Sequence, residues 1–220
     1  MREEMTFNYG FAMDGLDFGK ACRSLRRRDP IMRKAIKRVG PCRIDVDRNG
    51  FRRLVRSVVG QQLSTSAATT IWRRLLVLNG GRRVSPGKML SFSTAQLRGV
   101  GLSKAKCQAV LSIARRVFDG EVRLNELHRL SDEDVTAELI KLRGVGPWTA
   151  QMYLMFSLGR SDVFPTGDLG IVNAITALYT FNDRASENEM LKLATSWRPY
   201  RTIASWYLWQ ALDLFRDGEW

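Results

Sequence analysis

The sequence predicts an all-α protein. Apolar residues recur every three to four positions along most of its 220 residues, which is the spacing of helices that bury one face. Many of these periodic segments begin after Ser, Asp or Pro and end near Gly, as helices do. Only the segment "PCRIDVD" at 41–47 alternates as a strand would, and it does so weakly.

The first two helices are predicted by their caps. Asp17 precedes one periodic segment, and Asp29, followed by Pro30, precedes the next, which Gly40 ends. From the same signals we expect helices over 17–28, 29–40, 50–62, 64–81, 103–120, 131–142, 147–160, 167–179, 186–197 and 199–217.

The helices in the middle of the chain have caps of their own. Ser64 or Ser66 caps the fourth helix, Ser103 caps the fifth, and Ser131 with Asp134 has capping-box spacing at the sixth. The segment 147–160 is apolar on nearly every side, which predicts a central buried helix.

The chain contains no low-complexity linker, and we expect two helical lobes. Residues 1–45 and 161–220 would form one lobe from both chain ends, and residues 46–160 the other. The pentapeptide "LRGVG" occurs at 97–101 and at 142–146, each time before a helix. Each copy therefore predicts a tight glycine turn that presents backbone N–H groups at a helix N-terminus.

Composition restricts the classes of function. Lys and Arg outnumber Asp and Glu by 35 to 22, giving a net charge of +13, so we expect a polyanionic partner: nucleic acid first, a membrane surface second. No apolar run is long enough to span a bilayer, and the N-terminal "MREEMTFNYG" lacks a signal-peptide run, so we expect a soluble, cytoplasmic protein.

Cysteine and histidine are scarce. The three cysteines, Cys22, Cys42 and Cys107, are widely spaced, which argues against a disulfide framework, a zinc site and a four-cysteine iron–sulfur cluster. His128 is the only histidine, so metal ligation by histidines and Ser-His-Asp catalysis are excluded as well.

The second pentapeptide lies between two predicted helices and completes a helix–hairpin–helix over 131–159. Gly144 and Gly146 would permit the turn and a close approach of the backbone to a DNA phosphate.

With "FPTGD" at 164–168, the segment resembles the helix–hairpin–helix DNA glycosylase superfamily. The resemblance is strongest to the 3-methyladenine DNA glycosylase II branch, in its compact, all-helical form without an N-terminal α/β domain. The segments "VVGQQLSTSAA", "LRGVGLSKAKCQAVLSIA" and "WRPYRTIASWYLW" carry it over most of residues 50–212.

The resemblance implies an active site in the cleft between the lobes. Asp168 matches the catalytic aspartate, which stabilises the cationic sugar or helps a water attack it. Trp148, Trp209 and Met152 match positions that line the base pocket, although Met152 stands where the best-known bacterial members have an aromatic residue. Trp148 occupies the position of the Schiff-base lysine of strand-cutting relatives, which implies a hydrolytic enzyme without lyase activity.

The same resemblance assigns the contacts with DNA. Gln62 matches the residue inserted into the duplex, with Leu63 as the alternative, and Gly144, Gly146 and Thr149 match the hairpin contacts. The carbonyls of Leu142 and Val145 would bind a structural monovalent cation, Na⁺ or K⁺, and the chemistry needs no cofactor. The first pentapeptide would pack the core and offer Lys104 or Lys106 to a distant phosphate.

The implied function is flipping and hydrolytic excision of alkylated purines, such as 3-methyladenine, from double-stranded DNA in base excision repair, by a monomer. Two alternatives stay open: a helix–hairpin–helix damage-recognition protein without catalysis, and a strand-cutting glycosylase for oxidised bases. The preferred base among 3-methyladenine, 7-methylguanine, ethenoadenine and hypoxanthine is also open, since pocket volume decides it.

Overall fold

The computed structural model describes residues 17–81 and 83–220. Within these ranges every regular element is a helix, which confirms the predicted all-α class. The chain divides into two compact units, one of Met1–Val46 with Gly159–Trp220 and the other of Asp47–Leu158. The "MREEMTFNYG" segment and the rest of residues 1–16, predicted to belong to the lobe of the chain ends, lie outside the described residues.

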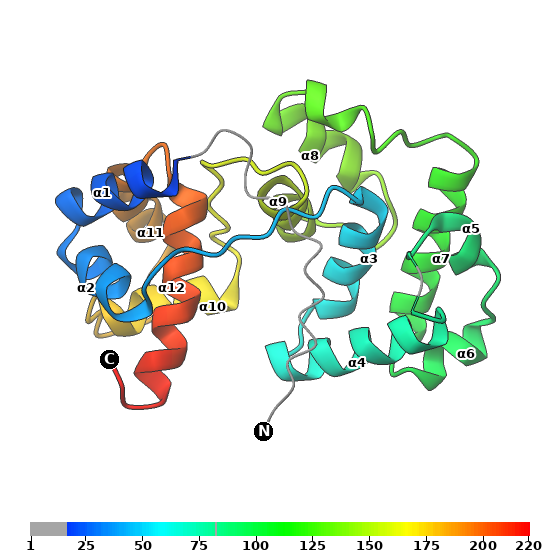
Figure 1. The fold of residues 1–220 in the computed structure, drawn as a ribbon, viewed down its shortest axis with the longest axis horizontal. Helices are drawn as coiled ribbons and strands as arrows, with labels where there is room; N and C mark the ends of the chain where they lie inside the picture. The colour runs from blue at the N-terminus through cyan, green and yellow to red at the C-terminus, as the bar shows by residue number, and fades with distance from the viewer. Residues whose placement is uncertain (1–16, 82) are drawn as a thin grey trace. The chain divides into compact units, whose positions relative to one another are not determined.

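The unit built from both chain ends is a cluster of helices around α12. Its helix α12 packs against α10 and α2, and α1 packs against α2 (Figure 1). Its elements are α1 (Phe18–Arg28), α2 (Pro30–Val39), α10 (Leu169–Leu178), α11 (Glu187–Ala194), the 3-10 helix η2 (Thr195–Trp197) and α12 (Arg201–Arg216).

Asp29 is the polar centre of this unit and is only 3% exposed. Its Oδ1 accepts hydrogen bonds from the backbone N–H groups of Ile31 and Met32, which confirms the predicted cap of α2. Its Oδ2 accepts from the Tyr179 hydroxyl and the Trp197 indole N–H, both at 2.7 Å. Burial, together with the negative charge of Asp29, raises the pKa of Tyr179 well above its usual range. The Asp29 carboxylate thus links the start of α2 to the ends of α10 and η2.

The second unit surrounds α9. Its helix α3 lies against α4, α7 and α9, and α8 packs on α9 (Figure 1). Its elements are α3 (Gly50–Gly60), α4 (Thr65–Leu78), α5 (Pro86–Leu90), α6 (Thr94–Gly99), α7 (Lys104–Phe118), the 3-10 helix η1 (Leu127–Arg129), α8 (Asp132–Ile140) and α9 (Pro147–Phe156). Six of the ten residues of α9 are buried, which confirms the predicted central helix.

Two short helices, α5 and α6, were not predicted. Both have cap signals: Ser85 precedes Pro86 at the start of α5, and Ser93 forms a full capping box with Gln96 at the start of α6. They were missed because segments of five and six residues are too short to show a helical period.

The weak alternation at 41–47 does not lead to a strand, although Val46 forms an isolated bridge. The described structure has no strand element there, but Ile44 and Val46 are buried at 3% and 4% exposure. Alternation in this segment therefore reflects an extended chain that buries every second side chain against helices.

No helix within the described ranges is both long enough and apolar enough to cross a bilayer.

Candidate active site and nucleic-acid interface

Asp168 begins helix α10 and has more than one partner. Its Oδ1 accepts from the backbone N–H of Ile171 at 2.9 Å, which is an N-cap, and from the indole N–H of Trp209 at 2.9 Å. Two of the predicted site residues, 41 positions apart in sequence, are therefore in direct contact. Both side chains are half-buried. A carboxylate oxygen that accepts from two donors is fixed in direction.

Gly170 makes room for this contact. A Cβ at position 170 would lie 2.8 Å from Cδ1 and 2.9 Å from Nε1 of Trp209, and 3.0 Å from Oδ1 of Asp168. The indole therefore rests directly on the backbone at the start of α10, and a side chain at this position would displace it.

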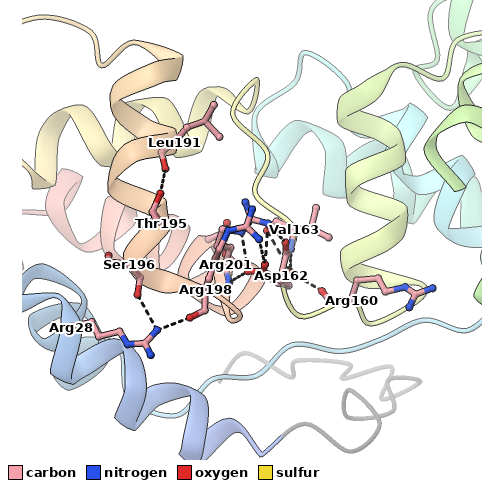
Figure 2. Close-up of polar contacts among 11 residues, drawn as sticks. Arg28, Arg160, Asp162, Val163, Leu191, Thr195, Ser196, Arg198 and Arg201 are labelled. Atoms are coloured by element: carbon pink, nitrogen blue, oxygen red, sulfur yellow. Dashed lines mark hydrogen bonds and ion pairs between the residues drawn. The ribbon is translucent and has the colours of Figure 1, made fainter. Parts of the chain in front are cut away.

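The loop that leads to Asp168 is fixed to the start of α12 by an ion pair. Oδ1 of Asp162 accepts from Nε of Arg201 at 2.8 Å and Oδ2 accepts from Nη2 at 3.0 Å, a two-pronged contact that Figure 2 shows. Nη2 of Arg201 also donates to the carbonyl of Asp162 at 2.7 Å. A second guanidinium, that of Arg198, donates through Nη1 to Oδ2 of Asp162 at 3.1 Å.

A buried hydroxyl fixes the same loop from its other side. Thr202 donates to the carbonyl of Arg160 at 2.7 Å and accepts from the N–H of Val163 at 3.0 Å. Arg28 of α1 donates to the carbonyl of Arg198 at 2.6 Å. Sequence reasoning missed these supports, because a lone Asp, Arg or Thr shows no pattern before its partner is known.

The hairpin between α8 and α9 uses its two glycines differently. Gly144 has φ +78°, and a Cβ there would lie 2.6 Å from Cβ of Ala109, so glycine is required for the turn and for packing on α7. Gly146 caps α9 with an ordinary φ of −110°, and no atom lies within 4 Å of where its Cβ would be. The positive φ of the turn therefore falls on Gly144 alone of these two glycines. Because Gly146 has no side chain, the N-terminus of α9 is left accessible, and no side chain caps that end of the helix.

The first "LRGVG" has another conformation. Gly99 lies inside α6, and Gly101 rather than the third residue of the pentapeptide has the positive φ, +108°. A Cβ on Gly101 would lie 3.0 Å from Ile71, so this turn packs on α4.

Gln61, at the end of α3, joins that helix to the hairpin. Its Nε2 donates to the carbonyl of Gly144 and to Oγ1 of Thr149, both at 2.8 Å. Thr149 is 1% exposed. The residue is therefore enclosed, and its hydroxyl accepts a hydrogen bond from Gln61.

Lys106 supports the same junction from α7. Its Nζ donates to the carbonyls of Val59 and Gln61, both at 2.8 Å, and burial lowers its pKa. Two of the three N–H donors of Lys106 therefore face the C-terminal carbonyls of α3. Lys104 is exposed.

Gln62 and Leu63 form an exposed turn after α3. Gln61 has φ −51° and ψ 129°, Gln62 has φ +56°, and the N–H of Leu63 donates to the carbonyl of Gly60 at 3.2 Å. This is a type II turn with glutamine where glycine is favoured, which costs about 1 kcal/mol or more. Both predicted wedge residues are solvent-exposed, Leu63 by 39%. A strained backbone at an exposed turn is typical of a segment that contacts a ligand.

Trp148 and Met152 lie four residues apart on α9 and so share a face of that helix. Trp148 is half-buried and Met152 is 7% exposed.

The hairpin carbonyls have been predicted to bind a cation. The carbonyl of Leu142 accepts from the N–H of Val145 at 3.0 Å, which uses one of its two lone pairs and leaves the other for an ion. In the described part of the chain no group of three or more His, Cys, Asp or Glu residues could hold a metal. Carbonyl oxygens alone fit a weakly held monovalent cation.

A family model described as HhH-GPD superfamily base excision DNA repair protein matches residues 55–199, which include the hairpin and Asp168. The chain belongs to the HhH-GPD superfamily. A solved structure of Schizosaccharomyces pombe 3-methyladenine DNA glycosylase in complex with abasic DNA is 32% identical, with a TM-score of 0.82 over 89% of this chain and 97% of that one. A Bacillus halodurans DNA-3-methyladenine glycosidase is 31% identical, with a TM-score of 0.73 over 94% of both chains.

Among sequence relatives, the Bacillus subtilis protein YfjP is 32% identical over 174 residues. The matched region covers 76% of this chain and 61% of that protein, so this chain spans less than two thirds of that relative's length.

Proposed function

We propose that this protein is a monofunctional DNA glycosylase that flips alkylated purines, such as 3-methyladenine, out of duplex DNA and excises them by hydrolysis. The observation that carries the proposal is the Asp168 carboxylate, held by the Trp209 indole in a chain with a helix–hairpin–helix. A protein that only binds DNA has no need of an oriented carboxylate. Relatives with about a third of their residues in common are named as 3-methyladenine glycosylases.

The chemistry breaks the bond between C1′ of the sugar and the purine nitrogen, and the electron pair leaves with the base. Asp168 stabilises the positive charge that develops on the sugar, and the water that adds to C1′ gives up its proton to the Asp168 carboxylate, which passes it to solvent. A base that already carries positive charge leaves without a general acid. Trp148 and Met152 contact the base, with the Trp148 indole face attracting its positive charge.

DNA binding uses the exposed turn and the hairpin. Gln62, or Leu63 beside it, fills the space of the extruded base, and the α9 N-terminus at Gly146 receives a backbone phosphate. The carbonyls of Leu142 and Val145 would hold a monovalent cation, which supplies positive charge next to that phosphate. No cofactor takes part in bond cleavage, and the protein acts as a monomer.

The test is release of bases from methylated duplex DNA by the wild-type protein and by Asp168→Asn. Asparagine also caps helices well, so the variant keeps the cap of α10 and loses only the charge. We expect base release to fall at least about a hundredfold while the thermal midpoint shifts by no more than a few degrees. Equal release by both proteins would refute the proposal.

Two further readouts separate the alternatives. If the wild-type protein binds damaged duplex but releases no base, the non-catalytic damage-recognition function is correct. If strands break without added alkali or heat, the enzyme has lyase activity and Trp148 has been interpreted wrongly.

A further inference from the structure

Helix α9 continues the face that carries Trp148 and Met152. Phe156 follows Met152 by four residues, as Met152 follows Trp148, so the three side chains form one stripe along the helix. Under the proposed function, on which this inference rests, the stripe faces the extruded base.

Arg53 of α3 lies over the end of this stripe. Its guanidinium carbon is 4.3 Å from the centroid of the Phe156 ring. Its Nε is buried without a hydrogen-bond partner, and the described residues provide no ion pair for the guanidinium. The nearby acid Asp47 is bound instead to Arg52, at 2.6 Å.

It is unusual for a half-buried arginine to stack on a ring without an ion-pair partner. Burial, reinforced by the positive charge of Arg56, lowers the pKa of Arg53 to about 9, so the side chain is still charged at neutral pH. The charge of Asp47 offsets part of this effect. A buried Nε–H without an acceptor is still unfavourable unless a ligand supplies one.

A guanidinium that stacks on a ring keeps its edge of N–H donors open. That edge is a planar fork, which matches two neighbouring acceptors in one plane. In nucleic acids the N7 and O6 atoms of a 6-oxopurine form such a pair, and arginine binds it through both prongs. Adenine derivatives present an amino group in place of O6, and a methyl group on N7 removes the other acceptor.

We infer that Arg53 is a specificity-determining residue that binds the N7 and O6 edge of an extruded neutral 6-oxopurine, of which hypoxanthine is the probe. The same residue disfavours bases with a 6-amino group, because its N–H donors would face the N–H donors of that group. It also disfavours bases with a positive charge, because the two positive charges repel each other. Of the bases that the sequence left open, hypoxanthine gains from Arg53 and 3-methyladenine does not.

A DNA phosphate is the other acceptor that a guanidinium binds. The stacking on Phe156 and the burial of Nε favour the base edge, since phosphate contacts are made mostly by solvated side chains. The experiment distinguishes these two acceptors. Loss of a phosphate contact would slow the release of every base equally, whereas loss of a base contact would change the ratio of hypoxanthine to 3-methyladenine release.

The experiment compares single-turnover release of hypoxanthine from duplex DNA with release of 3-methyladenine from methylated DNA. The variants are Arg53→Met, which keeps a long side chain on Phe156, and Arg53→Lys, which keeps the charge but lacks the fork. Arg73→Met is the matched control, since Arg73 is an exposed arginine on α4 and its loss removes the same charge. Circular dichroism and thermal midpoints establish that each variant is folded.

We expect both Arg53 variants to lower the ratio of hypoxanthine to 3-methyladenine release about tenfold, with Arg73→Met leaving the ratio within about twofold. A ratio unchanged by Arg53→Met overturns the inference, and so does wild-type protein that releases 3-methyladenine but no hypoxanthine. If the wild-type protein releases neither base, the proposed function itself fails, and the inference fails with it.

Discussion

At the scale of single residues, Asp168 shows how one side chain serves structure and chemistry together. An aspartate at a helix start is usually a cap, and Asp168 does cap α10 through Ile171. The same oxygen also accepts from Trp209, and this second bond is the feature that ordinary caps lack. Sequence reasoning named both residues, but it assigned Trp209 to the base pocket and did not foresee that it holds the carboxylate.

Gly170→Ala tests that contact. The added methyl group would lie within 3 Å of the indole and must displace it, while alanine suits a helix better than glycine. We expect the free energy of unfolding to stay within about 1 kcal/mol of wild type, and base release to fall about tenfold to a hundredfold because the carboxylate loses its orienting bond.

Gly167→Ala is the matched control, because its Cβ would meet no atom within 4 Å. Single-turnover base release and thermal unfolding are measured for both variants. Release by Gly170→Ala at the rate of Gly167→Ala would mean that Trp209 does not position Asp168.

At the scale of elements, helix positions were predicted well because their signals are local. The ten predicted ranges all contain helices, and the caps at Asp17, Asp29, Ser103 and Ser131 are present. The two "LRGVG" copies show the limit of such signals. Identical letters place the positive φ at Gly101 in one copy and at Gly144 in the other. The neighbours that each turn packs against, Ile71 and Ala109, decide which glycine turns.

Lys106→Met tests the junction of α3, α7 and the hairpin. The substitution removes two donors from the carbonyls at the end of α3. We expect the free energy of unfolding to fall by about 1–3 kcal/mol, as when a charged hydrogen-bond donor is lost. Chemical denaturation measures the change.

Lys104→Met is the control on the same helix, since Lys104 is exposed. Removal of its charge should change stability by no more than about 0.5 kcal/mol. If the two variants are equally stable, the bonds from Lys106 contribute nothing.

At the scale of the whole molecule, the net charge of +13 governs association with a polyanion. Cations from many segments would each neutralise a phosphate and release a counterion, so affinity for duplex DNA should fall steeply with salt. Between about 50 and 200 mM KCl we expect the dissociation constant to rise at least about a hundredfold.

Fluorescence anisotropy with an undamaged duplex measures this dependence, and thermal unfolding at the same salt concentrations controls for stability. An affinity that does not change with salt would contradict a phosphate-dominated interface.

The sequence by itself determined the helical class, most helix boundaries, the basic charge and the membership of the HhH-GPD superfamily, because periodicity, caps and motifs depend on residues close together in the chain. Contacts between residues distant in the sequence became known from the packing of the helices: Asp162 with Arg201, Gln61 with Gly144, and Arg53 with Phe156. Such pairs form where packing brings helices together, and each partner alone resembles any other surface residue. The tertiary structure also enclosed Thr149 and turned Lys106 inward, since the burial of a side chain depends on every element around it.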